Sequence, residues 1–306
     1  MTTRSQTTRS AWSVVIAAAS LVLGACDAVN EAIDAVDDIG NDAEVHYYVS
    51  LGTSLSVGVL SDPSGVLLPS DDGYADVLYD RIKPGFEAAG AQPRELRLIK
   101  LGCPGETLKK LVEGESCPYL AGSQLAAAVD FLEDNAGNIH LVTIDIGGND
   151  FRNANCIDTA VDVDCANAVS ADIAMDLAPV LAALRTAAGP DTTIVGMNYY
   201  NPYLASWLDG PAGEVLAVQS ADAVLVFTDL VRTTYETAGI PMADVAAAFE
   251  SNNFDLAPPP DELLPVAVAN ICAYTYMCDT DPLGPDIHAN RAGYRLIADT
   301  MEAMLP

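Results

Sequence analysis

Short apolar runs alternate along the chain with longer stretches in which apolar residues recur at helical spacing. The apolar runs, which are typical of buried parallel strands, cover about 45–51, 95–101, 139–146, 192–198 and 243–249. The helical pattern is found at 123–133, 171–187 and 214–237, and a last helix is expected over about 290–304. Strands that alternate with helices indicate βαβ units. We therefore predict one α/β domain over residues 44–306, with a doubly wound sheet of about five parallel strands.

Two segments lie outside this alternation. Residues 256–286 are rich in proline and are predicted to form a long ordered loop, not a second domain. Residues 27–43 are acidic and are predicted to form a solvated tether, with a short helix as the alternative. After residue 43 the sequence has no internal repeat and no low-complexity tract.

The first 25 residues are typical of an export signal. Arg4 and Arg9 precede an uncharged, mostly apolar run over residues 11–25, which is shorter than the ~20 residues of a membrane span and suits a signal peptide. The run ends in LGAC at 23–26, which resembles the lipobox of bacterial lipoproteins. This resemblance implies that Cys26 is diacylated and becomes the N-terminus of a membrane-anchored envelope protein. Ordinary signal cleavage, which would leave a secreted protein, is the alternative.

The charge balance excludes several classes of partner. Acidic residues outnumber basic residues 43 to 14, for a formal net charge of −29. So few cations cannot form a basic face for nucleic acid, and the excess of acids disfavours an anionic membrane surface. No segment after the signal is judged long and apolar enough to span a bilayer. We expect a monomer that contacts the membrane only through its lipid anchor.

Apart from Cys26, six cysteines fall in three close pairs. An exported chain meets an oxidising compartment, where an even set of cysteines is typical of disulfides. Of the 15 connectivities that six cysteines allow, we favour nearest neighbours because each pair brackets a loop-like segment. Metal binding is the rival interpretation, but the pairs lack C-x2-C spacing and have no histidine beside them. The predicted bridges are Cys103–Cys117, Cys156–Cys165 and Cys272–Cys278.

Polar residues follow the predicted strands, at the edge where an open α/β sheet binds its ligands. Of the three histidines, His46 and His140 lie at the opening ends of their strands, on the opposite edge. Only His288 can therefore reach Ser54. A serine needs an adjacent base to become a nucleophile, and glycine turns and an asparagine amide can donate to an oxyanion, so this set suits acyl transfer. The polar segments are GTSL at 52–55, GCPGET at 102–107, GGND at 147–150, NYYNP at 198–202 and DIHAN at 286–290.

Four blocks in this set resemble those of the SGNH, or GDSL-type, hydrolase superfamily. They are Ser54 in YVSLGTSLSVGV, Gly105 in KLGCPGETL, Asn149 in TIDIGGNDF and His288 in PDIHANRAGY. The blocks occur in order and span residues 47–294. The cysteine pairs are also similar to those of the secreted actinobacterial lipase-like branch. The resemblance implies a three-layer, flavodoxin-like fold and a serine ester hydrolase of the esterase or lipase type.

The resemblance also implies a role for each matching residue. Ser54 would be the nucleophile and, through its backbone N–H, the first oxyanion donor. The Gly105 N–H and the Asn149 side-chain amide would be the second and third donors. His288 would act as general base and then as acid for the leaving alcohol. Neither a metal ion nor an organic cofactor is expected.

Two positions depart from the family pattern. The aspartate of the GDSL motif is replaced by Thr53, which leaves open how the nucleophile turn is held. The usual third triad member lies three residues before the histidine, where this chain has Pro285, and Asp286 is one residue too late. Either Asp286 reaches the imidazole in a shifted register, or a backbone carbonyl replaces the carboxylate. We favour the carbonyl, and hence a Ser54–His288 dyad, and keep Asp286 as a candidate.

Several further side chains have more than one interpretation. Asp145, in an apolar strand, is interpreted as a buried carboxylate that loop N–H groups satisfy. Asn149 and Asp150 have helix capping as their alternative role. Four aromatic residues suit either the wall of an acyl pocket or the core: Tyr199, Tyr200, Tyr203 and Trp207.

The substrate class stays open between acyl esters, lipids and acetylated glycans. A polysaccharide or peptidoglycan O-acetyl esterase is one alternative to a general esterase. A catalytically inactive surface-binding lipoprotein is the alternative from another class of protein. The intact set of Ser54, Gly105, Asn149 and His288 argues against that last alternative, because a binding module needs no such set.

Overall fold

The computed structural model describes residues 43–90, 92–258 and 263–306. The predicted signal peptide, the lipidated Cys26 and the acidic tether up to residue 42 lie outside the described residues. They stay predictions.

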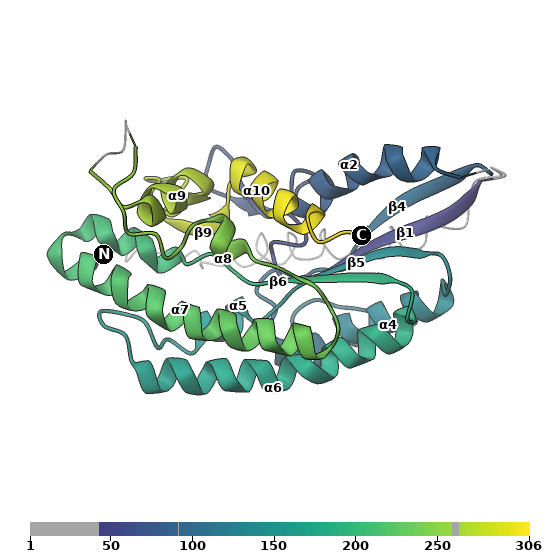
Figure 1. Ribbon diagram of the computed structural model, residues 1–306, viewed down its shortest axis with the longest axis horizontal. Helices are drawn as coiled ribbons and strands as arrows, with labels where there is room; N and C mark the ends of the chain where they lie inside the picture. The colour runs from purple at the N-terminus through teal and green to yellow at the C-terminus, as the bar shows by residue number, and fades with distance from the viewer. Residues whose placement is uncertain (1–42, 91, 259–262) are drawn as a thin grey trace, which may run out of the picture. The chain divides into compact units, whose positions relative to one another are not determined.

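A five-stranded parallel sheet forms the middle layer of the domain (Figure 1). Its order is β4-β1-β5-β6-β7, which counts as 2-1-3-4-5 along these five strands and is the flavodoxin-like order. The predicted doubly wound α/β fold is therefore confirmed. The strands are β1 Glu44–Gly52, β4 Arg94–Lys100, β5 Ile139–Asp145, β6 Thr193–Met197 and β7 Met242–Ala243.

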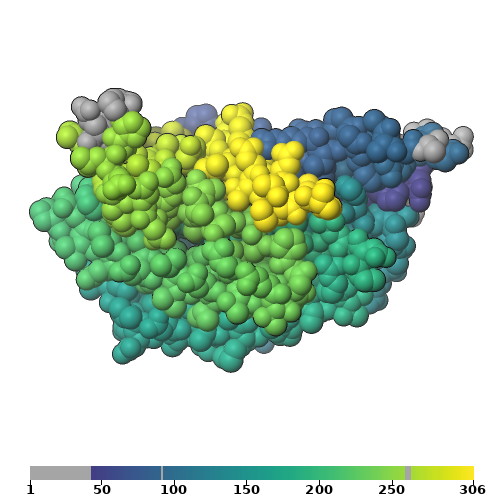
Figure 2. All heavy atoms as spheres, in the orientation of Figure 1, coloured from purple at the N-terminus to yellow at the C-terminus, as the bar shows by residue number. Residues whose placement is uncertain are grey.

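Helices cover both faces of this sheet (Figure 1). Helices α2 and α10 pack against each other over one face, and Figure 2 shows them side by side on the surface, in blue and yellow. Helices α4, α6 and α7 lie over the other face. The five helices are α2 Tyr74–Ala88, α4 Gln124–Asp134, α6 Val163–Ala188, α7 Pro211–Thr237 and α10 Arg291–Glu302.

The two helical layers explain why the strands read as continuous apolar runs. Tyr48 and Val49 are neighbours in β1, so their side chains point to opposite faces, and both are fully buried. Tyr48 belongs to the same buried cluster as Leu78 of α2 and Ile297 of α10. A strand with one solvated face would instead have alternated between apolar and polar residues.

The fifth strand is much shorter than predicted. Strand β7 contains only Met242 and Ala243, and the following Val245–Ala248 is helix α8. The Asp244 side chain accepts a hydrogen bond from the Ala247 N–H at 3.0 Å and so caps this helix. Because alanines favour helix over strand, the strand prediction for 243–249 was wrong beyond its first residue.

Helix α6 begins before the predicted residue 171, because Asp162 accepts a hydrogen bond from the Cys165 N–H at 3.0 Å and caps the helix. Its 26 residues are long and apolar enough to cross a membrane by length and composition, which corrects the expectation that no such segment follows the signal. In the domain it is a layer helix that packs against α4 and α7. Its residues Ile173, Leu177 and Leu181 are buried.

The proline-rich segment 256–286 contains regular structure that the loop prediction missed. Helix α9 covers Val266–Tyr274, and β8 Thr275–Tyr276 pairs antiparallel with β9 Asp286–Ala289. Helix α9 is apolar along nearly its whole length, so it lacks the polar stripe that marks a surface helix in a sequence. The other short elements are β2 Leu60–Ser61, β3 Leu67–Leu68, α3 Leu108–Glu113, α5 Gly148–Asn153 and the 3₁₀ helix η2 Pro202–Asp209.

Three disulfides join cysteines that are close in sequence, and each one holds a connection between elements. Cys103–Cys117 ties the loop after β4 to the segment before α4. Cys156–Cys165 spans the connection from α5 to α6, and Cys272–Cys278 joins α9 to the turn after β8.

Candidate active site

Ser54 lies in the turn that follows β1, at the carboxyl edge of the sheet. Gly52 ends the strand with a φ of +130°. A Cβ at this glycine would lie 2.0 Å from the Asp145 carbonyl oxygen, so a larger residue would not fit. The sharp turn leaves Ser54 8% exposed, which is enough for its hydroxyl to face a hollow in the surface.

The carboxylate of Asp145 holds the turn around Ser54 in place. Its Oδ2 accepts hydrogen bonds from the Thr53 N–H at 3.2 Å and from the Thr53 hydroxyl at 2.5 Å. Its Oδ1 accepts a third from the Tyr74 hydroxyl at 3.2 Å. Burial raises the pKa of Asp145 to about 7, and the hydrogen bonds oppose that rise. The interpretation of Asp145 as a buried carboxylate is confirmed. Its hydrogen-bond donors are one loop N–H and two hydroxyl groups.

His288 joins Ser54 to Asp286 through both of its ring nitrogens. Its Nε2 lies 2.9 Å from Ser54 Oγ, and its Nδ1 lies 2.7 Å from Asp286 Oδ1. The same Oδ1 accepts the His288 backbone N–H at 2.9 Å. Burial would raise the pKa of the Asp286 carboxyl, but the hydrogen bonds and charge of His288 outweigh it and lower the pKa.

This arrangement corrects the preference for a backbone carbonyl as the partner of the imidazole. Asp286 and His288 both belong to strand β9, where residues two apart point to the same face. A carboxylate two positions before the histidine can therefore reach the ring, and the missing carboxylate at Pro285 does not prevent the contact. Sequence spacing alone does not reveal this, because the usual family spacing is three.

The other two histidines lie at the opposite end of the sheet, against helix α2. The ring of His46 lies 5.1 Å from the ring of Phe86, and the ring of His140 lies 4.5 Å from the same ring. Burial lowers the pKa of His140. Both histidines are therefore half-buried side chains that pack against Phe86, at the edge of the sheet opposite to Ser54.

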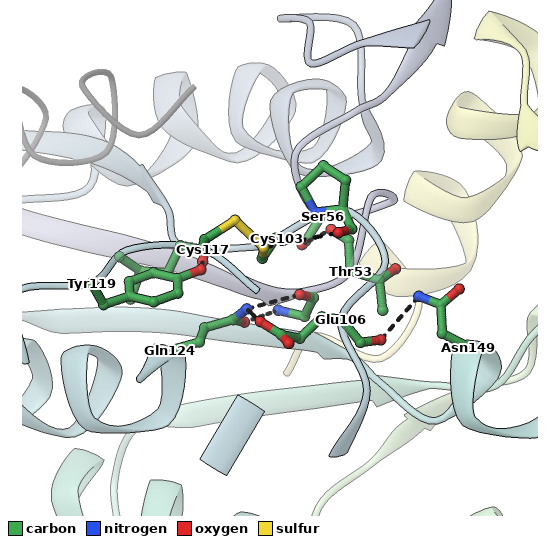
Figure 3. Close-up of a disulfide and its surroundings, with 11 residues drawn as sticks. Thr53, Ser56, Cys103, Glu106, Cys117, Tyr119, Gln124 and Asn149 are labelled. Atoms are coloured by element: carbon green, nitrogen blue, oxygen red, sulfur yellow. Dashed lines mark hydrogen bonds between the residues drawn. A yellow bond between two sulfur atoms is a disulfide. The ribbon is translucent and has the colours of Figure 1, made fainter. Parts of the chain in front are cut away.

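Gly105 and Asn149 lie next to Ser54 in a second hollow of the surface. Gly105 has a φ of +77° in the loop after β4, a conformation that favours glycine. Asn149 Nδ2 donates to the Glu106 carbonyl at 2.9 Å (Figure 3). Asn149 Oδ1 accepts from Arg152 Nη2 at 3.3 Å. The two contacts together fix which side of the amide faces the loop.

Asn149 and Asp150 do not share a role. The start of α5 has no side-chain cap, so Asn149 is not a capping residue of that helix. The Asp150 carboxylate instead accepts from the Leu108 N–H at 3.1 and 3.2 Å, at the start of α3. Burial raises the pKa of Asp150 to about 6. Asp150 therefore bonds to the first N–H of helix α3, which is distant in sequence, whereas Asn149 caps no helix start.

Sequence reasoning missed Gln124 and Glu106. Gln124 is fully buried; its Oε1 accepts the Gly52 N–H at 2.6 Å, and its Nε2 donates to the Gly52 carbonyl at 3.0 Å. The same Nε2 donates to Glu106 Oε2 at 3.1 Å, and Glu106 is 1% exposed (Figure 3). Burial raises the pKa of Glu106. Neither residue could be recognised in the sequence, because neither shares a motif with the residues that it bonds to.

A largely apolar hollow of about 640 Å³, partly open to solvent, opens beside Ser54 and His288. Tyr199, Tyr200 and Tyr203 line it, whereas Trp207 does not and lies near Phe254 instead. The apolar part of the remaining wall comes from Leu55, Phe151, Pro202, Val224, Phe227 and Ile287, and Thr53, Gly148, Asn149 and Arg152 complete the lining.

Among the residues that the structure describes, no group of three or more His, Cys, Asp or Glu side chains could hold a metal ion. The structure brings together a hydroxyl, an imidazole, a carboxylate and amide groups at one edge of the sheet, a set that suits acyl transfer. Each of these groups supplies proton transfer or hydrogen bonding without a further ligand.

The sequence matches the model of the GDSL-like Lipase/Acylhydrolase family over residues 50–296. No curated protein matches the sequence. Among solved structures, the fold is similar to phospholipase A1 from Streptomyces albidoflavus NA297, with 16% identity, a TM-score of 0.55 and coverage of 85% of this chain and 99% of that chain. It is also similar to an extracellular lipase from Streptomyces rimosus, with 18% identity, a TM-score of 0.52 and coverage of 85% and 100%. At these identities the likeness concerns the fold alone.

Proposed function

Because the chain belongs to the GDSL-like lipase/acylhydrolase family and is therefore a carboxylic ester hydrolase, we propose that it works through an acyl-enzyme on Ser54. The hydrogen-bonded series Ser54–His288–Asp286 carries the proposal. Its two contacts measure 2.9 Å from Ser54 Oγ to His288 Nε2 and 2.7 Å from His288 Nδ1 to Asp286 Oδ1. These are the lengths that proton transfer from a nucleophile to an oriented base requires.

The reaction begins with attack of Ser54 Oγ on the ester carbonyl. His288 Nε2 accepts the hydroxyl proton during the attack and then gives it to the leaving alcohol. The Asp286 carboxylate stabilises the imidazolium that forms between these two transfers. A water molecule then attacks the acyl-enzyme, with His288 again as the base, and releases the carboxylic acid.

Three donors are proposed to stabilise the tetrahedral oxyanion. They are the backbone N–H groups of Ser54 and Gly105 and the side-chain amide of Asn149. One N–H of that amide donates to the Glu106 carbonyl, and the amide has a second N–H for the oxyanion. Loss of one such donor typically costs about 3–4 kcal/mol of transition-state stabilisation.

The apolar hollow beside Ser54 supports an acyl chain longer than acetyl as the preferred substrate. Phe151, Val224 and Phe227 form part of its wall. A longer acyl chain would remove more of this apolar surface from water, and this burial favours binding. An acetyl group has little apolar surface to bury, so it would gain little from this wall. This observation favours an acyl esterase over the alternative of an O-acetyl esterase for glycans.

We also propose that the enzyme acts outside the cytoplasm, anchored through a lipidated Cys26 or secreted after ordinary cleavage. The three disulfides support export, because such bonds persist in oxidising compartments. Labelling of the intact cells with a radioactive fatty acid, compared between the parent and Cys26→Ser, tests the anchor. Absence of label from the parent would leave secretion as the remaining route.

Hydrolysis of 4-nitrophenyl esters across acyl lengths, by the parent and by Ser54→Ala, tests the serine mechanism. Ser64→Ala is the matched control, because the Ser64 hydroxyl is exposed and bonds to Asp62. We expect Ser54→Ala to lose hydrolysis and also covalent labelling by a fluorophosphonate, with Ser64→Ala unchanged. Retained hydrolysis by Ser54→Ala would exclude Ser54 as the nucleophile.

A further inference from the structure

Arg152 stands between two hollows that share the nucleophile. The apolar hollow described above lies on one side, and a second hollow of about 630 Å³, partly open to solvent, lies on the other. Both are lined by Ser54, His288 and Arg152. An ester bond held at Ser54 would thus place one half of the substrate in each hollow. The second hollow is also lined by Val59, Leu67, Pro69, Pro104, Gly105 and Asp286.

Arg152 is exposed, and within the described ranges none of the ion pairs includes it. Its guanidinium donates one hydrogen bond, from Nη2 to Asn149 Oδ1 at 3.3 Å. Four other cations of the described ranges, Arg94, Lys110, Arg185 and Arg295, also make no ion pair. Among the described residues, however, Arg152 is the one lysine or arginine that lines either hollow beside Ser54. Asp286, which lines the second hollow with Arg152, is bonded to His288, and the charge of Arg152 helps to lower the pKa of its carboxyl.

We propose that Arg152 binds an anionic group of the ester substrate, a proposal that rests on the proposed esterase function. A guanidinium has five N–H donors, and one bond to Asn149 leaves the rest for a phosphate or carboxylate. Such planar, charge-assisted contacts are the usual way in which proteins hold these anions.

The anion belongs to the alcohol half of the substrate. The hollow that would take the acyl chain is walled by Phe151, Val224 and Phe227, whose side chains offer an anion no hydrogen bond. The second hollow contains Gly105, which the first hollow lacks, and Arg152 faces it together with the Asp286 carboxylate, whose charge His288 partly offsets. The substrate class is therefore an acyl ester of an alcohol that bears a phosphate or carboxylate.

The test compares kcat/KM for two esters that differ in charge on the alcohol side: 1,2-dibutyrylglycerol 3-phosphate and 1,2-dibutyrylglycerol. A second pair places the charge on the acyl side: 4-nitrophenyl hemisuccinate and 4-nitrophenyl butyrate. The enzymes are the parent, Arg152→Gln, Arg152→Lys and the matched control Arg295→Gln. Arg295 is an exposed arginine of α10 that neither hollow includes.

We expect the parent to prefer the phosphate ester by about 5-fold, the effect of one partly exposed ion pair, and to lose the preference in high salt. Arg152→Gln should remove the preference, Arg152→Lys should keep part of it, and Arg295→Gln should keep all of it. A parent without the preference, or a preference that survives Arg152→Gln, would overturn the proposal. A preference for hemisuccinate that depends on Arg152 would overturn the placement on the alcohol side.

Binding separates this proposal from the esterase function. The Kd of the phosphate ester for Ser54→Ala, measured by calorimetry with and without Arg152→Gln, needs no turnover. If Arg152→Gln weakens binding about 5-fold while the parent hydrolyses no ester, the anion site stands and the esterase mechanism fails. Equal binding by both variants would overturn the anion site.

A second inference concerns Gln124, and it rests on different contacts. Gln124 is the first residue of α4, and its side chain bonds to both backbone groups of Gly52 and to Glu106 Oε2 (Figure 3). Gly52 lies two residues before Ser54, and Glu106 directly follows Gly105. One buried amide thereby links the two segments that carry the proposed backbone donors.

We infer that Gln124 is a positioning residue for the oxyanion donors. Glu106 connects to it through its carboxylate and to Asn149 through its carbonyl oxygen, at 3.1 and 2.9 Å. The Asn149 amide, Gly52 before Ser54 and Glu106 after Gly105 therefore belong to one hydrogen-bond network. Donors of this kind must be placed within about 0.5 Å to act on an oxyanion.

Gln124→Met, which keeps the volume and removes the hydrogen bonds, tests this role. The matched control is Asn198→Leu, another fully buried amide, which bonds to Asp244 and to the Ala246 N–H. We expect Gln124→Met to lower kcat at least ~10-fold with KM within ~2-fold, as for an interaction made in the transition state. Asn198→Leu should lower thermal stability without that kcat effect.

Unchanged kcat in folded Gln124→Met would overturn the inference. If Gln124→Met does not fold, Gln124→Glu provides the same test, because it keeps the acceptor for the Gly52 N–H and loses both donated bonds. Its rate of inactivation by a fluorophosphonate should then fall at least ~10-fold, and a parent-like rate would overturn the inference.

Discussion

The hydroxyl of Thr53 donates a hydrogen bond to the carboxylate of Asp145, a residue 92 positions away at the end of the neighbouring strand. The Thr53 N–H donates to the same oxygen, and Thr53 Oγ1 accepts from the Leu55 N–H at 3.3 Å. Thr53 therefore connects the turn around Ser54 to strand β5 and also bonds to Leu55, the residue that follows Ser54. A threonine at the position of the motif aspartate can hold the turn around Ser54 because the carboxylate comes from another strand.

Thr53→Val, which replaces the hydroxyl with a methyl group, should destabilise the enzyme and slow hydrolysis. It leaves Asp145 Oδ2 with one donor fewer in a buried site, a loss typically of about 1–3 kcal/mol. We expect a lower free energy of unfolding and a lower kcat, both of which Thr53→Ser should retain near parent values. Parent-like unfolding in urea by Thr53→Val would contradict a role for this hydroxyl.

The raised pKa of Asp145 predicts how stability changes with pH. Burial raises this pKa from 3.8 to about 7, so the folded protein binds more protons here than the unfolded chain between those values. The contribution of Asp145 to stability therefore falls as pH rises from about 4 to 7, by at most about 4 kcal/mol. Asp145→Asn should lack this fall. Urea unfolding of both proteins across this range measures it, and a parent-minus-variant difference that rises with pH would contradict it.

Asp286→Asn should reduce kcat/KM strongly, because Asp286 Oδ1 lies 2.7 Å from the imidazole. The corresponding change costs ~10⁴ in a serine protease, so we expect a loss of ~10² or more, and ~10³ or more for His288→Asn. Asp279→Asn, which changes an exposed carboxylate nearby in sequence, is the control. A loss near ~10-fold for Asp286→Asn would instead support a Ser54–His288 dyad.

The Cys103–Cys117 disulfide should matter more for activity than Cys156–Cys165. Cys103 lies two residues before Gly105, so the bridge constrains the loop of a proposed oxyanion donor. Each serine double variant should lose about 2–3 kcal/mol of stability, since both bridges close short loops. We expect the larger fall in kcat for Cys103→Ser/Cys117→Ser at a temperature where both variants are folded. Equal kcat values would contradict a role for this bridge in the site.

Titration of the denatured, oxidised protein checks the pairing itself. No thiol should be found among the six paired cysteines, and reduction should lower the melting temperature. Three or more free thiols would contradict the three bridges.

Val224→Phe should shorten the preferred acyl chain. Val224 is 7% exposed and lines the apolar hollow, whereas Val226 of the same helix is 39% exposed and does not. The larger ring fills space that an acyl chain would occupy, so kcat/KM for long 4-nitrophenyl esters should fall about 10-fold relative to short ones. Val226→Phe is the control and should leave the acyl preference unchanged. The same preference in both variants would show that the hollow does not bind the acyl chain.

The sequence by itself determined the fold class and the positions of its long elements. The apolar runs predict four of the five strands closely, because a strand buried on both faces is recognisable from a few consecutive residues. The strand prediction failed at residues 243–249, where a short apolar run suits either a strand or a helix. There Asp244 caps helix α8, and most of the run is helical. The sequence also predicted that Ser54 and His288 lie at the same edge of the sheet, because strand ends and motif blocks can be recognised from a few consecutive residues.

Only the tertiary structure decided what holds those residues. Asp286 reaches His288 because both lie on one face of a short strand that the sequence had placed in a loop. Gln124 and Glu106 belong to no motif, and Thr53 finds its carboxylate on another strand. These hydrogen bonds join residues as far apart as 72 and 92 positions, and their partners are set by chain topology and burial. Local hydrophobic periodicity cannot specify such pairs, since it records only which face of an element is buried.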